Sequence, residues 1–207
     1  MRNLINVIHP HTYKMLKKEK GFTLNVGPCE EYAERDKRVS SFLHEAIDSG
    51  AKIMHYQNAS ANSLNRIFMD NSLKFDTLYK LLFDGRIETL GTTSQGIPAP
   101  DIKPTFISDE VWKYLREEII SHSELESKIG KPSTTFFIGG VLENCVENFA
   151  AYYALNYKNG ERTICVPELC ASFNEDGARD ARKKLIERGI EMISYDEAIN
   201  LLHRNNS

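Results

Sequence analysis

Short apolar, β-branched runs alternate along the chain with segments of helical spacing, and this alternation constrains the fold more than any other feature. The expected strands cover residues 4–8, 51–56, 134–138, 163–166 and 190–193. The expected helices cover residues 39–46, 64–83, 108–119, 144–156, 176–188 and 194–203. Helices between successive strands produce βαβ units, so we expect an α/β fold with a mostly parallel sheet covered on both faces.

A chain of 207 residues is expected to form a single domain, residues 1–207, around one sizeable core. Its formal charge of -3 gives no reason to expect nucleic acid or an anionic membrane as partner. No apolar run reaches the roughly 18 residues that span a bilayer. The N-terminus has no secretory pattern, and the cysteines form no CxxC pair. We therefore expect a reduced, cytoplasmic protein.

Residues 84–104 are rich in glycine and proline, which predicts a long irregular loop. A loop of this length in a compact domain is usually functional or mobile. Ligands of open parallel sheets bind beyond the carboxyl ends of the strands. Candidate site residues are therefore the polar and reactive groups at those ends, namely His9, His11, His55, Lys103 and the segment 139–145.

The segment before Cys145 has the form of a strand that ends at Ile138, followed by Gly139 and Gly140 and then a helix. Cys145 would arrive in the first turn of that helix, where backbone N–H groups stabilise a thiolate and lower its pKa. The same donors can hold the oxyanion of a tetrahedral intermediate. Two interpretations stay open, because a cysteine here is either a nucleophile or a buried residue that fills space.

Residues 136–146 (Phe-Phe-Ile-Gly-Gly-Val-Leu-Glu-Asn-Cys-Val) resemble the nucleophile segment of the isochorismatase-like cysteine hydrolases. In that family an apolar strand leads to Gly, a small or apolar pair, Thr-Asp, one residue and Cys-Val; here Leu and Glu stand where Thr-Asp is usual. Residues 168–172 are similar to the family's Asp-Ala-Cys-Ala-Ser segment, with Glu for Asp. Residues 39–56 are similar to its first helix and second strand.

This resemblance implies a three-layer α/β/α Rossmann-like fold, often assembled as a dimer or larger homo-oligomer. It also implies a cis peptide bond before the nucleophile, here between Gly140 and Val141. The oxyanion site would then be formed around Gly140, Val141 and Leu142, with the backbone N–H groups of Val141 and Cys145 as the donors.

The family's hydrolases use an Asp, a Lys and the Cys. Lys103 lies 42 residues before Cys145, close to the family spacing, and is either this lysine or an ordinary solvated one. The Asp has no counterpart, because His9 follows the first strand in its place and His11 stands at the position of a family Gln. His9 either replaces the Asp as the base of a Cys–His pair, or it is a structural histidine in a chain that has lost catalysis.

A metal or a nucleotide cofactor is not expected. Nicotinamidases of the family bind a divalent ion through an Asp and several His after the second strand, but after His55 this chain has no His before His122. No GxGxxG or phosphate-binding loop follows a strand.

The expected function is the hydrolysis of an amide, imide or similar C–N bond of a small molecule. Cys145 would act through a thioester, with Lys103 polarising the site and His9 moving the proton. The alternative is a catalytically impaired member that binds a small molecule or a protein partner, and the missing Asp motivates it. Vinyl-ether hydrolysis is a third option, but that branch of the family usually lacks the cysteine.

Overall fold

The computed structural model describes residues 3–9, 29–58, 87, 89–93, 96–98, 100, 116–157 and 160–204. The described strands are β1 (Asn3–Ile8), β2 (Lys52–Asn58), β3 (Thr89–Thr92), β4 (Thr134–Gly139), β5 (Arg162–Cys165) and β6 (Glu191–Met192). The described helices are α2 (Cys29–Asp48), α6 (His122–Ile129), α7 (Glu147–Asn156), α8 (Glu175–Glu187) and α9 (Tyr195–Arg204). Short helical turns are η1 (Arg116–Glu118), η2 (Leu142–Val146) and η3 (Pro167–Leu169).

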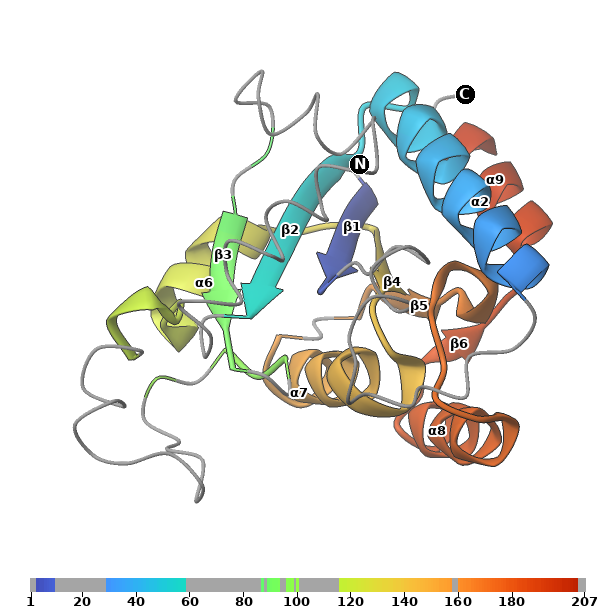
Figure 1. Ribbon diagram of the computed structural model, residues 1–207. Helices are drawn as coiled ribbons and strands as arrows, with labels where there is room; N and C mark the ends of the chain where they lie inside the picture. The colour runs from blue at the N-terminus through green and yellow to red at the C-terminus, as the bar shows by residue number, and fades with distance from the viewer. Residues whose placement is uncertain are drawn as a thin grey trace.

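The described strands form one sheet in the order β3-β2-β1-β4-β5-β6, and every neighbouring pair is parallel. This confirms the predicted α/β class. The chain builds outward from β1 to β3 and then, on the other side of β1, from β4 to β6 (Figure 1). The direction of growth therefore reverses between β1 and β4, which is the switch point of a doubly wound sheet.

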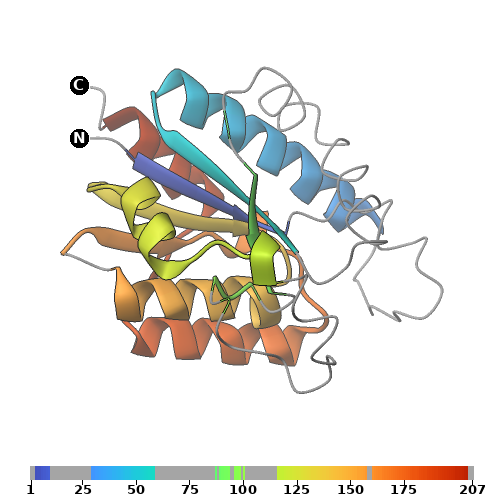
Figure 2. The same cartoon turned by 90° about the vertical axis from the view of Figure 1, so that its left-hand side faces the viewer.

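Helices cover both faces of the sheet, so the described residues have three layers. Figure 2 shows α2 and α9 on one face and α7 and α8 on the other. The core divides in the same way, because β1 sends Ile5 and Val7 into the cluster under α2 and α9, and Leu4 and Ile8 into the cluster under α7 and α8. Alternate side chains of a strand point to opposite faces, and an apolar strand buried on both faces is typical of a parallel sheet.

The helical layer of α2 and α9 follows directly from the sequence. Helix α2 buries Val39, Phe42, Leu43 and Ala46, which have the spacing of one helical face. It ends at Asp48 and is followed by Gly50, whose φ of +69° is the left-handed conformation of a glycine C-cap. At α9, a capping box forms: Ser194 N–H donates to the Glu197 carboxylate, and Glu197 N–H donates to Ser194 Oγ.

Three features differ from the sequence-based expectations. Strand β3 lies inside the segment predicted as an irregular loop, where it pairs with β2 from His55 opposite Thr89 onward. Helix α2 begins at Cys29 instead of residue 39, so it includes a highly charged segment without a clear apolar face. Helix α6 was not predicted; Ser121 caps it, accepting a hydrogen bond from Glu124 N–H.

The predicted helix 64–83 lies outside the described residues, as do residues 108–115 of the predicted helix 108–119. The described end of the latter is the 3₁₀ turn η1, followed by the buried Ile119. No described helix has both the length and the apolar character needed to cross a bilayer.

Candidate active site

The candidate site lies at the switch point, where the carboxyl ends of β1 and β4 meet. Ile8 is directly opposite Gly139 in the register of these two strands. His9 follows Ile8, and Gly140 leads from β4 into the turn η2, which carries Cys145. The topology therefore brings His9 and Cys145, two of the residues predicted from the sequence, to neighbouring strand ends.

Gly139 and Gly140 are needed because the chain passes very close to β1 at this point. Gly139 has a φ of +114°, and a Cβ atom there would lie 2.9 Å from the carbonyl oxygen of Ile8. A Cβ atom on Gly140 would lie 2.5 Å from Cys145 Sγ and 2.7 Å from the same Ile8 oxygen. Only glycine fits at distances this short. The thiol of Cys145 therefore lies directly against the Gly140 backbone.

Cys145 lies in a π-helical turn that is fixed at its start by backbone hydrogen bonds. Its thiol is 3.7 Å from the Val141 carbonyl oxygen, and the residue is only 2% exposed. Ala171 N–H donates to Gly140 O, and Leu142 N–H donates to Ala171 O, both at 2.8 Å. The peptide bond between Gly140 and Val141 is trans, so the expectation of a cis bond there is wrong.

Burial raises the pKa of Cys145 to about 12. Hydrogen bonds with the backbone at Val141, Cys145 and Val146 act in the opposite direction, as expected for a thiol at the start of a helix, but the loss of solvation outweighs them. The sequence-based expectation of a lowered pKa is therefore wrong. At neutral pH the side chain is a thiol, and it needs a proton acceptor before it can act as a nucleophile.

Glu143 ties the turn η2, which carries Cys145, to the segment after β5. Its Oε1 accepts hydrogen bonds from Ser172 Oγ at 3.1 Å, from Asn174 N–H at 3.2 Å and from Phe173 N–H. A carboxylate that accepts several backbone N–H groups makes strong, charge-assisted bonds. Glu143 therefore holds in place the segment that follows Cys170 and Ala171. The resemblance indicated only that Glu stands for Asp here, and not which groups it binds.

His9 has an unusual backbone conformation. Its φ of +42° makes it the one non-glycine residue with positive φ among the described residues. Its N–H donates to Tyr56 O at 3.0 Å, and its Nε2 is 2.8 Å from Thr92 Oγ1 at the end of β3. Both His9 and Thr92 are buried. The imidazole is thus directed towards β3, and strain of this kind is typical of functional sites.

The turn after β3 covers the backbone of Cys145. Gly96 has a φ of +81°, and a Cβ atom there would lie 2.6 Å from the carbonyl oxygen of Cys145. Gly96 N–H donates to Thr93 O at 2.8 Å, and Ile97 N–H donates to Thr93 Oγ1 at 3.0 Å. Thr92, Thr93 and Gly96 were missed as site residues, although they fall in the glycine-rich segment that was predicted to be a long loop, either functional or mobile.

Three further predicted residues lie at the edge of the site or outside the described chain. His55 is buried in β2 with its Nδ1 3.1 Å from Thr89 Oγ1, and burial lowers its pKa to about 4. Lys103 and His11 lie outside the described residues. No group of three potential metal ligands occurs within the part of the chain that the structure describes. The catalytic roles assigned to Cys145, Lys103 and His9, and the oxyanion role of Gly140, Val141 and Leu142, stay predictions.

Comparison with known proteins identifies the fold. No protein-family model matches the sequence, and no curated protein sequence matches it significantly. Among solved structures, YcaC from Escherichia coli, described as an octameric hydrolase of unknown specificity, has a TM-score of 0.59 at 14% identity, covering 98% of this chain and 80% of that one. Nicotinamidase PncA from Bacillus subtilis has a TM-score of 0.58 at 13% identity, covering 92% and 98%.

MAR1 ribonuclease from Caenorhabditis elegans is also similar, with a TM-score of 0.55 at 13% identity, covering 96% of this chain and 79% of that one. The chain therefore shares the three-layer α/β/α fold of these proteins, which is the fold that the resemblance implied. Identities this low concern the fold alone, and proteins that share a fold can differ in activity.

Proposed function

We propose that this protein is a thiol-dependent hydrolase that cleaves an amide, imide or similar C–N bond of a small molecule, with Cys145 as the nucleophile and no cofactor. The observation that carries the proposal is the close approach of Gly140 to Cys145 Sγ at the switch point of the sheet. Parallel α/β sheets bind their ligands at this position. Because Gly140 has no side chain, the Cys145 thiol at this short distance lies beside main-chain groups and not beside another side chain.

In the proposed reaction, the Cys145 thiol passes its proton to His9 and the sulfur attacks the carbonyl carbon of the substrate. The resulting oxyanion is held by backbone N–H groups around Val141 and Cys145. The C–N bond then breaks, the amine leaves with the proton from His9, and a thioester remains on Cys145. Water attacks the thioester, which releases the acid and restores the thiol. Lys103 stabilises the negative charge in this scheme.

A second candidate function is supported by two specific observations. The pKa of Cys145 is raised to about 12, and the position of the family's Asp holds His9, whose ring is bonded to Thr92. Both observations favour a protein that binds a small molecule or a partner without cleaving it. The two functions differ in whether the thiol is needed.

The test is a screen of small amides, beginning with nicotinamide, with the wild-type protein and the Cys145→Ala variant. A hydrolase loses all turnover in this variant and keeps its unfolding temperature. Turnover that survives the substitution refutes the thioester mechanism. A binding protein instead shows no turnover and retains the affinity of any small-molecule ligand found for the wild type after the thiol is removed.

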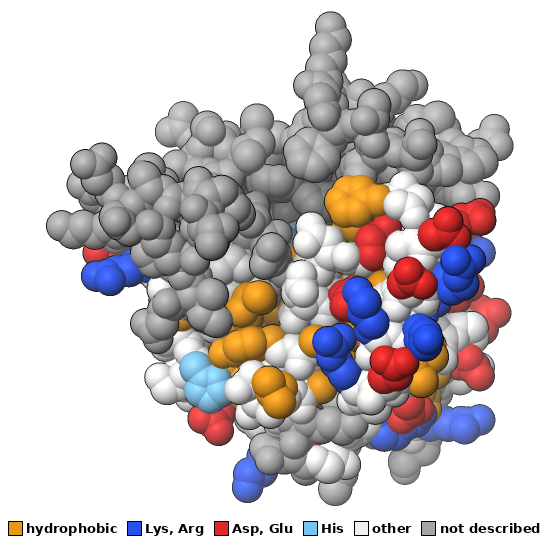
Figure 3. Space-filling model, turned by 90° about the horizontal axis from the view of Figure 1, so that it is seen from below, with side chains coloured by type: hydrophobic (Ala, Val, Ile, Leu, Met, Phe, Trp, Pro, Cys, Tyr) orange, Lys and Arg blue, Asp and Glu red, His pale blue; other side chains and the backbone are white. Residues whose placement is uncertain are grey.

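We also propose that the protein forms a homo-oligomer through the outer face of α7. Leu155 on α7 and Ile186 on α8 are 84% and 57% exposed, and Ala151, Tyr152, Ala154, Leu155 and Arg188 line a hollow of about 410 Å³ there. Figure 3, a view onto the side of α7 and α8, shows hydrophobic side chains gathered on this face. Helix α7 is apolar from Phe149 to Leu155, and a contiguous exposed apolar patch marks an interaction site. Substitution Leu155→Ser is expected to lower the mass measured by light scattering, and an unchanged mass refutes this interface.

A further inference from the structure

Helix α2 directs a buried cation towards the carboxyl end of β4. The Arg35 side chain is only 5% exposed, and its Nη1 donates to the carbonyl oxygen of Gly139 at 3.2 Å. Its Nε and Nη2 both donate to Asp36 Oδ1. A buried guanidinium is costly to desolvate unless its hydrogen bonds are satisfied, so a position of this kind is seldom occupied by arginine without a reason.

Arg35 takes the place of a missing strand partner. The ladder between β4 and β5 ends where Val166 N–H donates to Phe137 O, because the chain leaves the sheet at Pro167 and enters η3. In a continued parallel ladder the next donor of β5 would reach the Gly139 carbonyl. In this structure that N–H belongs to the 3₁₀ turn η3 and is no longer part of the sheet. Arg35 supplies the hydrogen bond instead, from the α2 side of the sheet.

The Gly139 carbonyl belongs to the peptide group that leads into Gly140. The direction of the Gly139 carbonyl therefore sets the plane of the Gly139–Gly140 peptide. Gly140, at the other end of this peptide, lies directly against Cys145 Sγ. Because Gly139 has a φ of +114° and no side chain, the backbone here has more conformational freedom than elsewhere in β4. A fixed hydrogen-bond donor at this carbonyl restricts that freedom.

We propose that Arg35 is a positioning residue that holds the Gly139–Gly140 turn in the shape required for acylation of Cys145. The inference rests on the proposed hydrolase function and adds a residue that neither the sequence motif nor the resemblance indicated. Arg35 acts through the backbone, from the opposite face of the sheet, and does not touch the substrate. Its planar fork binds Gly139 and Asp36 together, which a lysine ammonium cannot do in the same geometry.

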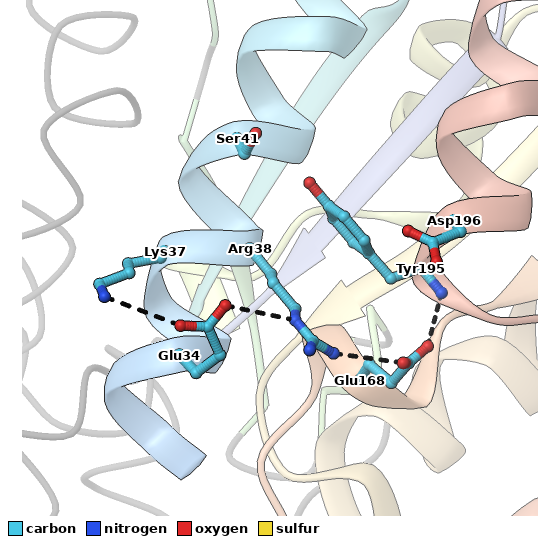
Figure 4. Close-up of a pocket in the computed structure, with 7 residues that line it drawn as sticks. All are labelled: Glu34, Lys37, Arg38, Ser41, Glu168, Tyr195 and Asp196. Carbon is cyan, nitrogen blue, oxygen red and sulfur yellow. Dashed lines mark hydrogen bonds and ion pairs between the residues drawn. The ribbon is translucent and has the colours of Figure 1, made fainter. Parts of the chain in front are cut away.

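Arg38 provides a matched control one turn further along α2. Its Nη1 donates to Glu168 Oε1 at 3.2 Å, and its Nε lies 3.7 Å from Glu34 Oε1. Figure 4 shows these pairs at the hollow between α2, η3 and α9. Arg38 thus links α2 to η3, but its side chain is 38% exposed, and its third described contact is with the Tyr195 ring instead of the Gly139–Gly140 turn.

The experiment compares two reactions of Cys145 in the wild type and in the Arg35→Met, Arg35→Lys and Arg38→Met variants. p-Nitrophenyl acetate acylates the thiol: sulfur bonds to the acetyl carbon, the ester C–O bond breaks, nitrophenolate leaves, and the thiol proton passes to solvent. Iodoacetamide alkylates the same sulfur without forming an oxyanion. Mass spectrometry identifies the modified cysteine, and thermal unfolding is measured for each variant.

We expect Arg35→Met to slow acylation of Cys145 by about 10- to 100-fold, the size of effect that a misplacement of about 1 Å produces. Arg35→Lys should give a smaller loss in the same direction. Iodoacetamide alkylation should change by less than about threefold in both, because it does not use the oxyanion site. Arg38→Met should leave both reactions unchanged.

Each remaining outcome overturns a specific claim. Equal losses in acylation and alkylation, with a lower unfolding temperature, mean that Arg35 is merely structural. Acylation of both Arg35 variants at the wild-type rate also refutes the positioning role and leaves the hydrolase proposal standing. If Arg35→Met does not fold, the Arg35→Lys result decides. A wild-type protein that p-nitrophenyl acetate does not acylate at Cys145 refutes the hydrolase proposal, and the positioning role with it.

Discussion

Substitution of Gly140 by Ala tests whether the main chain and the thiol are as close as the structure describes. The added Cβ would lie 2.5 Å from Cys145 Sγ, 2.7 Å from Ile8 O and 3.0 Å from His9 O. Favourable contacts of carbon atoms lie at about 3.5–4.0 Å, so the overlap is about 1 Å. The sulfur can rotate away, but the Ile8 carbonyl belongs to a strand in the middle of the sheet and cannot.

Overpacking of this kind costs about 1–3 kcal/mol and occasionally more, and contact with two backbone oxygens places Gly140→Ala at the upper end, about 3 kcal/mol. For a chain of this length the unfolding temperature should fall by about 6–12 °C, which calorimetry measures. Rotation of the sulfur should also change the rate at which iodoacetamide alkylates Cys145. Both effects arise from the same contact.

Gly50→Ala is the control for this measurement. Gly50, just after α2, has a φ of +69°, and a Cβ atom there would have no heavy atom within 4 Å, so Ala meets left-handed strain of about 1–2 kcal/mol without a clash. The reasoning fails if Gly140→Ala unfolds at the wild-type temperature, or if the control loses as much stability. Either result means that the turn before Cys145 is looser than the distances indicate.

Three further predictions concern titration and burial. Because the pKa of Cys145 is about 12, its alkylation by iodoacetamide should rise about tenfold per pH unit from pH 7 to 11, and a plateau below pH 9 contradicts the burial argument. Thr92→Val removes the hydroxyl beside His9 Nε2 and should cost about 1–3 kcal/mol in urea unfolding, whereas a neutral effect means that this bond stabilises nothing. The pKa of His55 is lowered to about 4, so the unfolded chain takes up a proton first as pH falls. Stability should therefore decrease by up to about 3 kcal/mol between pH 6.5 and 4, and His55→Gln should remove that part of the slope.

The parts of the fold that the sequence predicted are those in which local pattern and burial agree. Strands β1 and β4 are buried along their length and carry mostly apolar residues, and helix α2 is amphipathic from Val39 onward. Strand β3 has a weak pattern, because Thr-Leu-Gly-Thr contains one large apolar residue, Leu90, and a glycine. Its conformation comes from pairing with β2, which is a tertiary effect and leaves little trace in a four-residue segment.

The sequence predicted the site residues that lie close together in one motif. It did not predict those that come together from distant parts of the chain. Gly139, Gly140 and Cys145 lie within one seven-residue segment of the chain. Thr92 reaches His9 across 83 residues, and Arg35 reaches Gly139 across 104. Nothing in the local sequence around Arg35 distinguishes it from the solvated charges of the same helix. Only the position of α2 against the end of β4 shows that this arginine is buried.

The register of β1 and the backbone of His9 place the His9 ring beside Thr92. Ile8 pairs with Gly139 and packs in the same cluster as Cys145, so the strand's alternation gives Ile8 the side that faces Cys145. His9 comes next in the chain, and its left-handed backbone places its ring against Thr92. A buried thiol with a pKa of about 12 gains nucleophilic character only when a base reaches it. The hydrolase proposal therefore requires the His9 ring to leave its hydrogen bond with Thr92 and to bond with the Cys145 thiol during turnover. A protein that only binds its ligand requires no such change of partner. Acylation of Cys145 by p-nitrophenyl acetate separates the hydrolase from the binding protein, because only the hydrolase forms a thioester on Cys145.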